Sequence, residues 1–260
     1  MRIAAFVPLG LLGRLRQASS EQSIHSISSL SSFRSAFRSE HFDGFVLDPS
    51  VILGKQRDIL TETLESEKKS VVIYVSPTPT ALRYTLEILH LGVCQLIVCD
   101  YGDDSKTLRR ALNALPHATP AVSFIVNMRE PLSRLNSTLM TVLLGVLTGG
   151  PIPAAKAIGT AMSSSRRSVD RWLLDADLKP ASWFLSIARF LRVIPKLEAG
   201  TSTDAIVLYG SYSSRDSFER DVRRITGLTY DQAAELARSD PSRLTALLAA
   251  KSVLNASEKS

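Results

Sequence analysis

The first 115 residues alternate between short apolar runs and longer amphipathic stretches. The apolar runs predict five strands, at Ile3 to Val7, Ser23 to Ser28, Gly44 to Asp48, Val71 to Val75 and Gln95 to Cys99. The stretches after them predict helices at Leu11 to Gln17, around Phe33 and Phe37, and at Gln56 to Lys69, Thr80 to Leu91 and Asp104 to Leu115. Because such strands and helices bury both faces of a sheet, we expect a five-stranded, doubly wound parallel α/β sheet.

The second half is expected to be all-α. Pro116 and Pro120 are typical of a linker, and apolar helical runs follow at 121–126, 132–135 and 139–147. A long helix is predicted from Pro180 to Ala199, with later helices at Thr229 to Ala237 and Ser242 to Leu254. Since a proline removes one backbone hydrogen bond, Pro195 is expected to bend or split the long helix.

Four segments follow from this pattern. They are an α/β domain at 1–116, a linker and connecting helix at 117–130, a helical domain at 131–240, and a C-terminal helix and tail at 241–260. A chain of this length is sufficient for two ordinary domains.

One segment of the helical half has the pattern of a helix-turn-helix. A short helix at about Thr203 to Tyr209 precedes a Gly-Ser turn and a helix from Ser214 to Ile225. Its apolar positions, Phe218, Val222 and Ile225, recur every three to four residues, so they form one inward stripe. Ser213 and Ser214 can cap this helix, and Thr226-Gly227 closes it.

A second such segment lies about fifty residues upstream. Ser165 can cap a helix that continues to Asp177, with Val169 and Leu173 pointing inward. The helix before it, roughly Pro153 to Met162, opens with a proline and is rich in alanine. The two segments therefore predict paired helix-turn-helix motifs.

Residues 131 to 238 resemble the DNA-binding unit of the AraC/XylS family of transcription regulators. Matching positions in the second motif are Tyr212-Ser213, Phe218, Arg220, Arg223-Arg224 and Thr226-Gly227, whereas Ser211 stands at the family's turn glycine and Val222 replaces its usual phenylalanine. The resemblance implies that two recognition helices enter successive major grooves of double-stranded DNA. It suggests as DNA-binding residues Ser165, Arg166, Arg167, Ser168, Arg171, Ser214, Arg215, Asp216, Ser217, Arg220, Arg223 and Arg224. The candidates for base edges among them are Arg167, Arg171, Arg215 and Arg220.

The charge distribution agrees with an anionic partner for the second half. Residues 1–120 hold 13 basic and 12 acidic residues, whereas residues 121–260 hold 18 and 13. However, Asp170, Glu219 and Asp221 lie on the predicted recognition helices, where they repel phosphate. They favour an alternative, a protein-interaction module in which DNA binding is weakened or lost.

The α/β half resembles the receiver domain of bacterial response regulators. Asp48 and Ser76 match the phosphoacceptor and the hydroxyl that follow its third and fourth strands. Pro8-Leu9-Gly10 replaces the acidic pair that holds Mg²⁺, and Cys99-Asp100 replaces the lysine. We therefore expect a degenerate receiver in which Asp48 caps a turn before Pro49 rather than accepting phosphate. It would serve dimerisation, or bind a partner or a small ligand at the ends of the strands.

No pattern of catalytic or metal-binding residues is visible. His25, His41, His90 and His117 are scattered, and Gly10-Leu-Leu-Gly13 lacks the spacing of a nucleotide-binding loop. We expect no catalytic activity, cofactor or metal. Cys94 and Cys99 are separated by an odd offset, so they are expected on opposite faces of a strand as free thiols of a reducing compartment. Pro8, Arg14 and Arg16 argue against a signal peptide and no apolar run is long enough for a membrane span, so a cytoplasmic protein is expected.

Overall fold

The computed structural model describes residues 1–19, 22–67, 69–101, 104–113, 118–150, 152 and 155–254, without the side chains of 155 and 156. The chain divides into two compact units, Met1–Val122 and Ser123–Ser260. Pro120 begins α6 (Pro120–Asn127), which lies within the segment 117–130 predicted as a linker and connecting helix. Pro116 and Pro153 lie outside the described residues.

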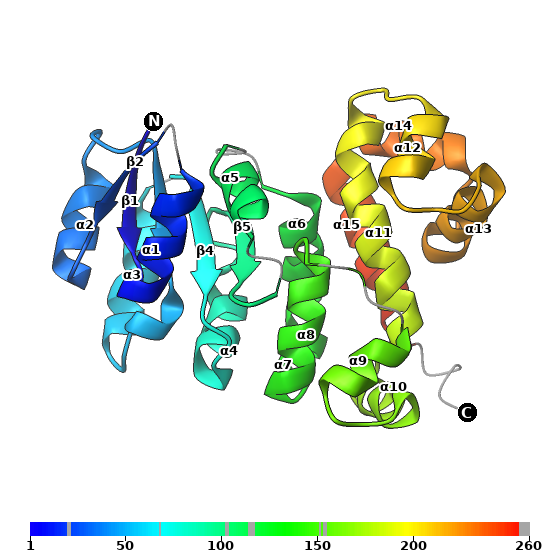
Figure 1. Cartoon of the computed structure of the whole chain (residues 1–260), viewed down its shortest axis with the longest axis horizontal. Coiled ribbons are helices and arrows are strands. Elements are labelled where there is room, and N and C mark those ends of the chain that lie inside the picture. Colours follow the sequence, from blue (N-terminus) through cyan, green and yellow to red (C-terminus); the bar gives the residue numbers. More distant parts are fainter. Residues whose placement is uncertain are drawn as a thin grey trace. The chain divides into compact units, whose positions relative to one another are not determined.

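The first unit is built on a parallel sheet of five strands (Figure 1). These are β1 (Arg2–Phe6), β2 (Ser23–Ser26), β3 (Gly44–Leu47), β4 (Val71–Val75) and β5 (Val93–Val98). Their order is β2-β1-β3-β4-β5, which reverses between β1 and β3 as in other doubly wound sheets. The predicted fold class is confirmed.

Helices cover both faces of this sheet. On one face α1 (Leu9–Ala18) packs against α5 (Ser105–Asn113), and Leu15 and Leu108 share a core cluster with Val46. Phe45, the residue before Val46, points to the opposite face of the sheet and contacts Phe33. That face is covered by α2 (Leu30–Arg38), α3 (Gln56–Ser66) and α4 (Pro79–Ile88).

An irregularity in β5 changes the expected position of the cysteines. The pairing between β4 and β5 shifts register, because Val71 pairs with Val93 while Val72 pairs with Gln95. A bulge of this kind places one extra residue on β5 and breaks the alternation of faces. Cys94 and Cys99 consequently belong to the same core cluster, so the expectation of opposite faces is wrong. Both are buried thiols without a disulfide.

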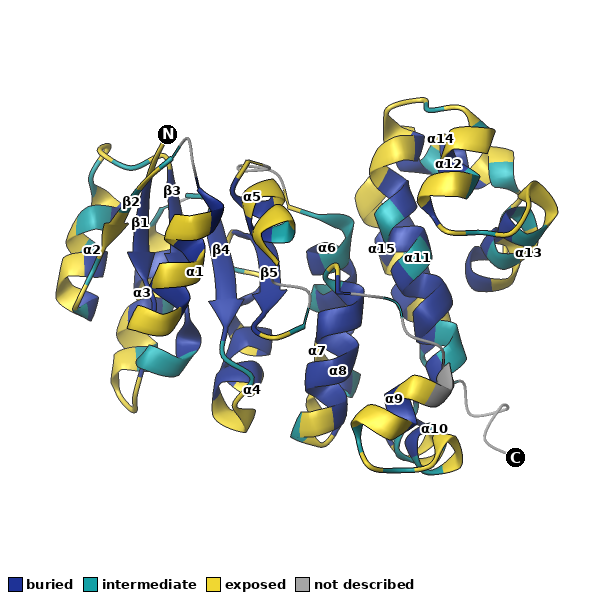
Figure 2. Ribbon diagram, viewed as in Figure 1, coloured by how far each residue is buried: buried dark blue, intermediate teal, exposed yellow. Residues whose placement is uncertain are grey.

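The second unit is helical in its described part. Its elements are the end of α6, then α7 (Arg129–Ser133), α8 (Ser137–Leu147), α9 (Ala155–Ala161), α10 (Arg166–Asp175), α11 (Ala181–Glu198), α12 (Thr203–Tyr209), α13 (Arg215–Thr226), α14 (Tyr230–Ser239) and α15 (Pro241–Ser252). The residues of α8 from Leu139 onward are buried, and this helix packs on α11 (Figure 2). The unit is therefore organised around these two helices.

Helix α11 joins the two predicted motifs and is called the connector below. It runs as one helix through Pro195, so of the two predicted effects of this proline, a bend or a split, the split does not occur. Pro195 lies one turn before the end at Glu198, and its carbonyl accepts a hydrogen bond from Ala199 at 3.2 Å. Pro195 lacks the N–H that would bond to the Leu191 carbonyl, so the helix continues past it with one backbone hydrogen bond fewer.

Candidate nucleic-acid interface

The first helix-turn-helix consists of α9 and α10. The Ser165 hydroxyl accepts a hydrogen bond from the Ser168 amide at 3.1 Å, which caps α10 as predicted. Val169 and Leu173 are buried, so they hold the helix on its inner side. A Cβ at Gly159 would lie 2.7 Å from the Ser164 carbonyl oxygen. The backbone of α9 thus passes the start of α10 at a distance that only glycine permits.

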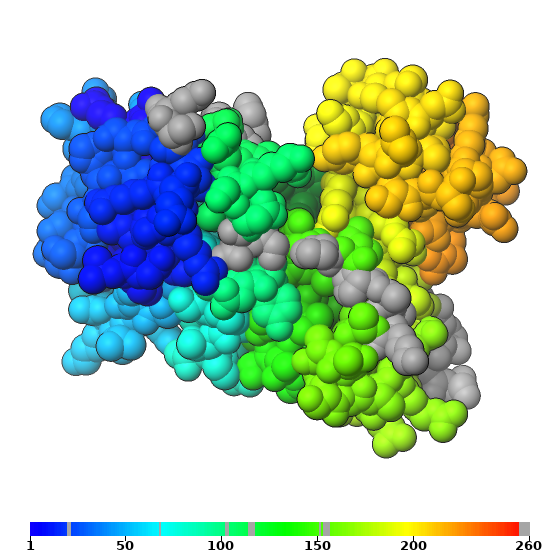
Figure 3. Space-filling model, viewed as in Figure 1, coloured from blue at the N-terminus to red at the C-terminus, as the bar shows by residue number. Residues whose placement is uncertain are grey.

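The second helix-turn-helix, α12 and α13, is built in the same way. Ser214 caps α13 by accepting a hydrogen bond from the Ser217 amide at 3.2 Å, and Gly227 ends it with a φ of +77°. Phe218, Val222 and Ile225 are fully buried. The predicted helices of this motif are confirmed, and Figure 3 shows α12 and α13 on the surface of the second unit.

The two turns share a further feature. Ser163 follows the end of α9 by two residues, and Ser211 follows the end of α12 by two residues. Both have a left-handed backbone, with φ of +50° and +56°. Ser211 therefore adopts the conformation for which a turn glycine is usually required.

The candidate residues of α10 lie on its outer side. Arg166, Arg167 and Arg171 are exposed. Arg166 Nε is 3.5 Å from the Asp170 carboxylate, and the same carboxylate accepts a hydrogen bond from the Ala181 amide at the start of the connector. Asp170 therefore has a structural role, and its charge is partly offset. Arg167 and Arg171 form no ion pair within the described part of the chain.

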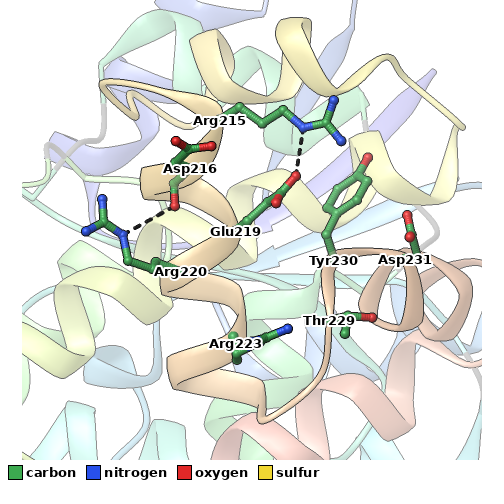
Figure 4. Close-up of a pocket in the computed structure, with 8 residues that line it drawn as sticks. All are labelled: Arg215, Asp216, Glu219, Arg220, Arg223, Thr229, Tyr230 and Asp231. Atoms are coloured by element: carbon green, nitrogen blue, oxygen red, sulfur yellow. Dashed lines mark hydrogen bonds and ion pairs between the residues drawn. The ribbon is translucent and has the colours of Figure 1, made fainter.

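The outer side of α13 borders an open groove that also includes the start of α14 (Figure 4). Arg215 Nε donates to the Glu219 carboxylate at 2.7 Å, and this bond raises the pKa of Arg215. Arg220 Nε lies 3.5 Å from the Asp216 carbonyl oxygen. The groove is lined by Arg215, Asp216, Glu219, Arg220, Arg223, Thr229, Tyr230 and Asp231.

The charges in this groove are mixed, with three arginines and three carboxylates. Exposed ion pairs such as Arg215–Glu219 are screened by solvent and contribute little to stability, so a phosphate group can compete for the guanidinium. The contribution of Thr229, Tyr230 and Asp231 was not predicted. Thr229 and Gln232 form a capping box, which is a pattern that the sequence does display.

Arg224 differs from the other candidate arginines. Its guanidinium donates to the Ser186 hydroxyl of the connector at 2.6 Å and pairs with Asp221 at 2.7 Å. It also lies 5.4 Å from the centre of the Trp183 ring. These contacts direct Arg224 toward the connector, so it attaches α13 to α11.

In the first unit, Asp48 is buried and fully occupied by donors. Its carboxylate accepts hydrogen bonds from the Ser50 amide at 2.8 Å, the Ser76 amide at 3.2 Å and the Ser76 hydroxyl at 2.6 Å. It caps the short 3₁₀ helix η1 (Pro49–Val51), as expected from the following proline. Asp100, after β5, pairs with Arg14 at 2.9 Å. The carboxylates of Asp48 and Asp100 are thus both engaged by neighbouring donors.

Neither a metal-binding cluster nor a membrane-spanning helix is present among the described residues. No group of three His, Cys, Asp or Glu side chains there lies close enough to hold a metal ion. Within the same residues, no helix combines the length and apolar character that crossing a membrane requires.

No protein-family model matches this chain, and no curated protein matches it in sequence. Among solved structures, the chain is similar to full-length FixJ from B. japonicum, with 14% identity and a TM-score of 0.36 over 88% of this chain and 98% of that one. At this TM-score the similarity supports no inference about function.

Proposed function

We propose that this protein is a sequence-specific DNA-binding transcription regulator of the AraC type, in which α10 and α13 enter successive major grooves. The supporting observation is that two helix-turn-helix motifs of the same construction are joined by one connector. In each, a serine caps the recognition helix, a serine with positive φ makes the turn, and arginines lie on the outer side. A regulator of this kind acts in the cytoplasm.

The arginines have different roles in this proposal. Arg167, Arg171, Arg215 and Arg220 are exposed and read base edges or bind phosphates, because arginine can donate two hydrogen bonds to guanine. Arg166 and Arg223 contribute to phosphate binding, and Ser165, Ser168, Ser214, Asp216 and Ser217 lie at the helix starts that approach the backbone. Arg224 acts indirectly, since it holds α13 on the connector.

The first unit serves as an input or dimerisation domain that does not need phosphorylation. This is supported by Asp48, whose carboxylate oxygens are buried and hydrogen-bonded to Ser50 and Ser76. The strand order reverses between β1 and β3, and doubly wound sheets bind ligands at such a point. A small ligand, a partner protein or a second copy of this chain is the candidate input.

The test is selection of bound duplexes from a random DNA pool, followed by binding measurements over a series of salt concentrations. We expect an enriched sequence with two half-sites about one helical turn apart, and affinity that falls with salt with a slope of about −0.9 per phosphate contacted. The double variant Arg167→Ala/Arg220→Ala should abolish selection, whereas Arg243→Ala, an exposed arginine on α15, should not. Absence of binding even at low salt refutes the proposal.

The alternative is a protein-interaction module. It is favoured by the acidic side chains of the recognition helices, since Asp170, Glu219 and Asp221 all pair with neighbouring arginines. If those pairs persist against DNA, fewer guanidinium groups are available to phosphate. If the chain does not bind duplex DNA but forms a stable complex with another protein, this alternative is favoured.

A further inference from the structure

Trp183, in the first turn of the connector, contacts residues from both motifs. Lys179 Nζ, which belongs to the segment that leaves the first motif, lies 5.7 Å from the centre of the indole ring. The guanidinium of Arg224, from the recognition helix of the second motif, lies 5.4 Å from it. Cations at these distances are attracted by the face of an indole ring. One side chain thus contacts both halves of the DNA-binding unit.

The same indole is tied to the end of α15. Its Nε1 donates a hydrogen bond to the Ser252 hydroxyl at 3.0 Å, and that hydroxyl also donates to the Leu248 carbonyl at 2.8 Å. Ser252 is completely buried. A buried hydroxyl that uses both its donor and its acceptor function fixes the position of its partners more strictly than an apolar contact does.

The last residue of α15 and the two residues after it continue this attachment. Lys179 donates its amide to the Ser252 carbonyl at 3.0 Å, Leu254 donates to the Asp177 carbonyl at 2.8 Å, and Leu178 forms an antiparallel bridge with Val253. We call residues 252–254 the strap. It pairs with residues 177–179, which connect α10 to the connector. The strap therefore holds the exit of the first motif.

Helix α15 holds the second motif. It packs against α13 and α14 as well as against the connector. Leu244, Leu248 and Ala249 on its inner side are buried. Through α15 the strap is continuous with the surroundings of the second recognition helix.

We propose that Trp183 and the strap form a clamp that fixes α10 and α13 relative to each other, so that the protein accepts only one spacing of two DNA half-sites. The consequence for DNA rests on the proposed function, whereas the coupling of the two helices is a property of the second unit alone. The segment 176–180 is the covalent link between α10 and the connector, and the Asp170 carboxylate adds one hydrogen bond to the Ala181 amide. The clamp adds directional hydrogen bonds to that link.

The coupling is tested by the distance between the recognition helices. Spin labels are attached at Arg167→Cys and Asp216→Cys in the full chain, two exposed positions on α10 and α13. Mass spectrometry verifies that the buried Cys94 and Cys99 remain unlabelled. The labelled protein with the wild-type residues at the clamp should give a narrow distribution of distances between the two spin labels. Trp183→Phe, which keeps an aromatic ring but removes the N–H donor, and a chain ending at Ser252 should both broaden it.

The control is Ser239→Ala. Ser239 makes the same kind of bond within its helix as Ser252, since its hydroxyl donates to the Glu235 carbonyl at 2.9 Å, but it is exposed and lies outside the clamp. It should leave the distribution narrow. Circular dichroism verifies that each variant is folded. A distribution that is equally narrow in Trp183→Phe and in the shortened chain overturns the proposal.

The second measurement uses the selected duplex with its half-sites moved by one or two base pairs. Each base pair shifts and rotates one half-site about the DNA axis, so a fixed reader should lose affinity about tenfold or more. The clamp variants should bind each spacing within about threefold of the others. If wild type binds no duplex, the proposed function fails and the spin-label distances alone decide on the clamp. If wild type discriminates spacing and the clamp variants discriminate equally, the clamp alone fails.

Discussion

The aromatic ring of Tyr212 lies directly on Gly210, the residue that ends α12. A Cβ at Gly210 would stand 2.6 Å from Cε2 of that ring and 3.0 Å from a methyl group of Val193. Tyr212 also contacts the ring of Phe218 at 4.9 Å between centres. The turn of the second motif is therefore packed from both sides. There is no room for the methyl group that an alanine at position 210 would add.

We expect Gly210→Ala to lower the free energy of unfolding by about 1–3 kcal/mol, the usual cost of overpacking. Urea denaturation followed by circular dichroism measures it. The control is Gly13→Ala in α1, where no atom lies within 4 Å of the added Cβ. That variant should gain about 0.5–1 kcal/mol because alanine favours a helix. Equal effects would contradict the packing argument.

The left-handed serines of the two turns give a second expectation. Ser163→Gly and Ser211→Gly should each raise the free energy of unfolding by up to about 1 kcal/mol, because glycine adopts a positive φ without the cost that other residues meet. Thermal denaturation measures the gain. Ser202→Gly, at a φ of −59°, should bring no gain. Destabilisation by both turn variants would show that the hydroxyls matter more than the backbone.

Asp48 is expected to stay unphosphorylated. Incubation with a small phosphodonor and Mg²⁺ should leave the mass of the intact protein unchanged, since Ser50 and Ser76 occupy the carboxylate. Asp48→Ala should cost about 1–3 kcal/mol of stability, because it leaves buried donors without an acceptor. A phosphoryl adduct at Asp48 would contradict this reading of the site.

The buried thiol of Cys94 should make stability depend on alkaline pH. Burial raises the pKa of Cys94 from 9.0 to about 11. Between these values the unfolded chain has lost a proton that the folded chain retains, so the free energy of unfolding should fall as pH rises from 9 to 11, by about 2 kcal/mol. Below pH 9 this contribution is constant. Chemical denaturation of wild type and Cys94→Ala across this range is the measurement.

Comparing wild type with Cys94→Ala cancels the contribution of other groups that titrate in this pH range. Burial also raises the pKa values of Tyr84 and Tyr212, but both residues are present in the wild type and the variant. The difference between the two pH profiles therefore belongs to Cys94. Parallel profiles would mean that the thiol ionises alike in the folded and unfolded chains.

Two neighbouring arginines should differ when substituted. Arg223→Ala should weaken binding to all duplexes alike and reduce the salt slope by about one contact, since Arg223 borders the groove. Arg224→Ala should instead lower the free energy of unfolding, because it loses Ser186, Asp221 and the Trp183 ring. Binding titrations and urea denaturation of both variants separate the two roles. If Arg223→Ala lowered the stability and Arg224→Ala lowered only the binding, the two proposed roles would be contradicted.

Local patterns predicted the elements well. The strands follow from apolar runs such as Val71–Val75, and the starts of α10 and α13 follow from Ser165 and Ser214, because caps depend only on residues three positions apart. The inward positions of α13 follow from its period.

Features that depend on distant residues were not predictable. The register shift beside Val93 reversed the expected face of Cys94, since a bulge has no clear sequence signal. Trp183 donates its hydrogen bond to Ser252 in another helix, a partner that no local pattern indicates. The direction of the Arg224 side chain was also not predictable. The helical period alone places it on the outer side of α13, whereas its hydrogen bond to Ser186 directs it toward the connector.

The pairing of Leu178 with Val253 also affects when the protein can mature. During synthesis the chain emerges from the ribosome from its N-terminus, and α9 and α10 emerge long before α15. Their locking hydrogen bonds must wait until Val253 and Leu254 have been translated. A nascent chain stalled before that point would have both recognition helices without the proposed clamp, so a fixed spacing between them would arise only after α15 and residues 253–254 had been synthesised.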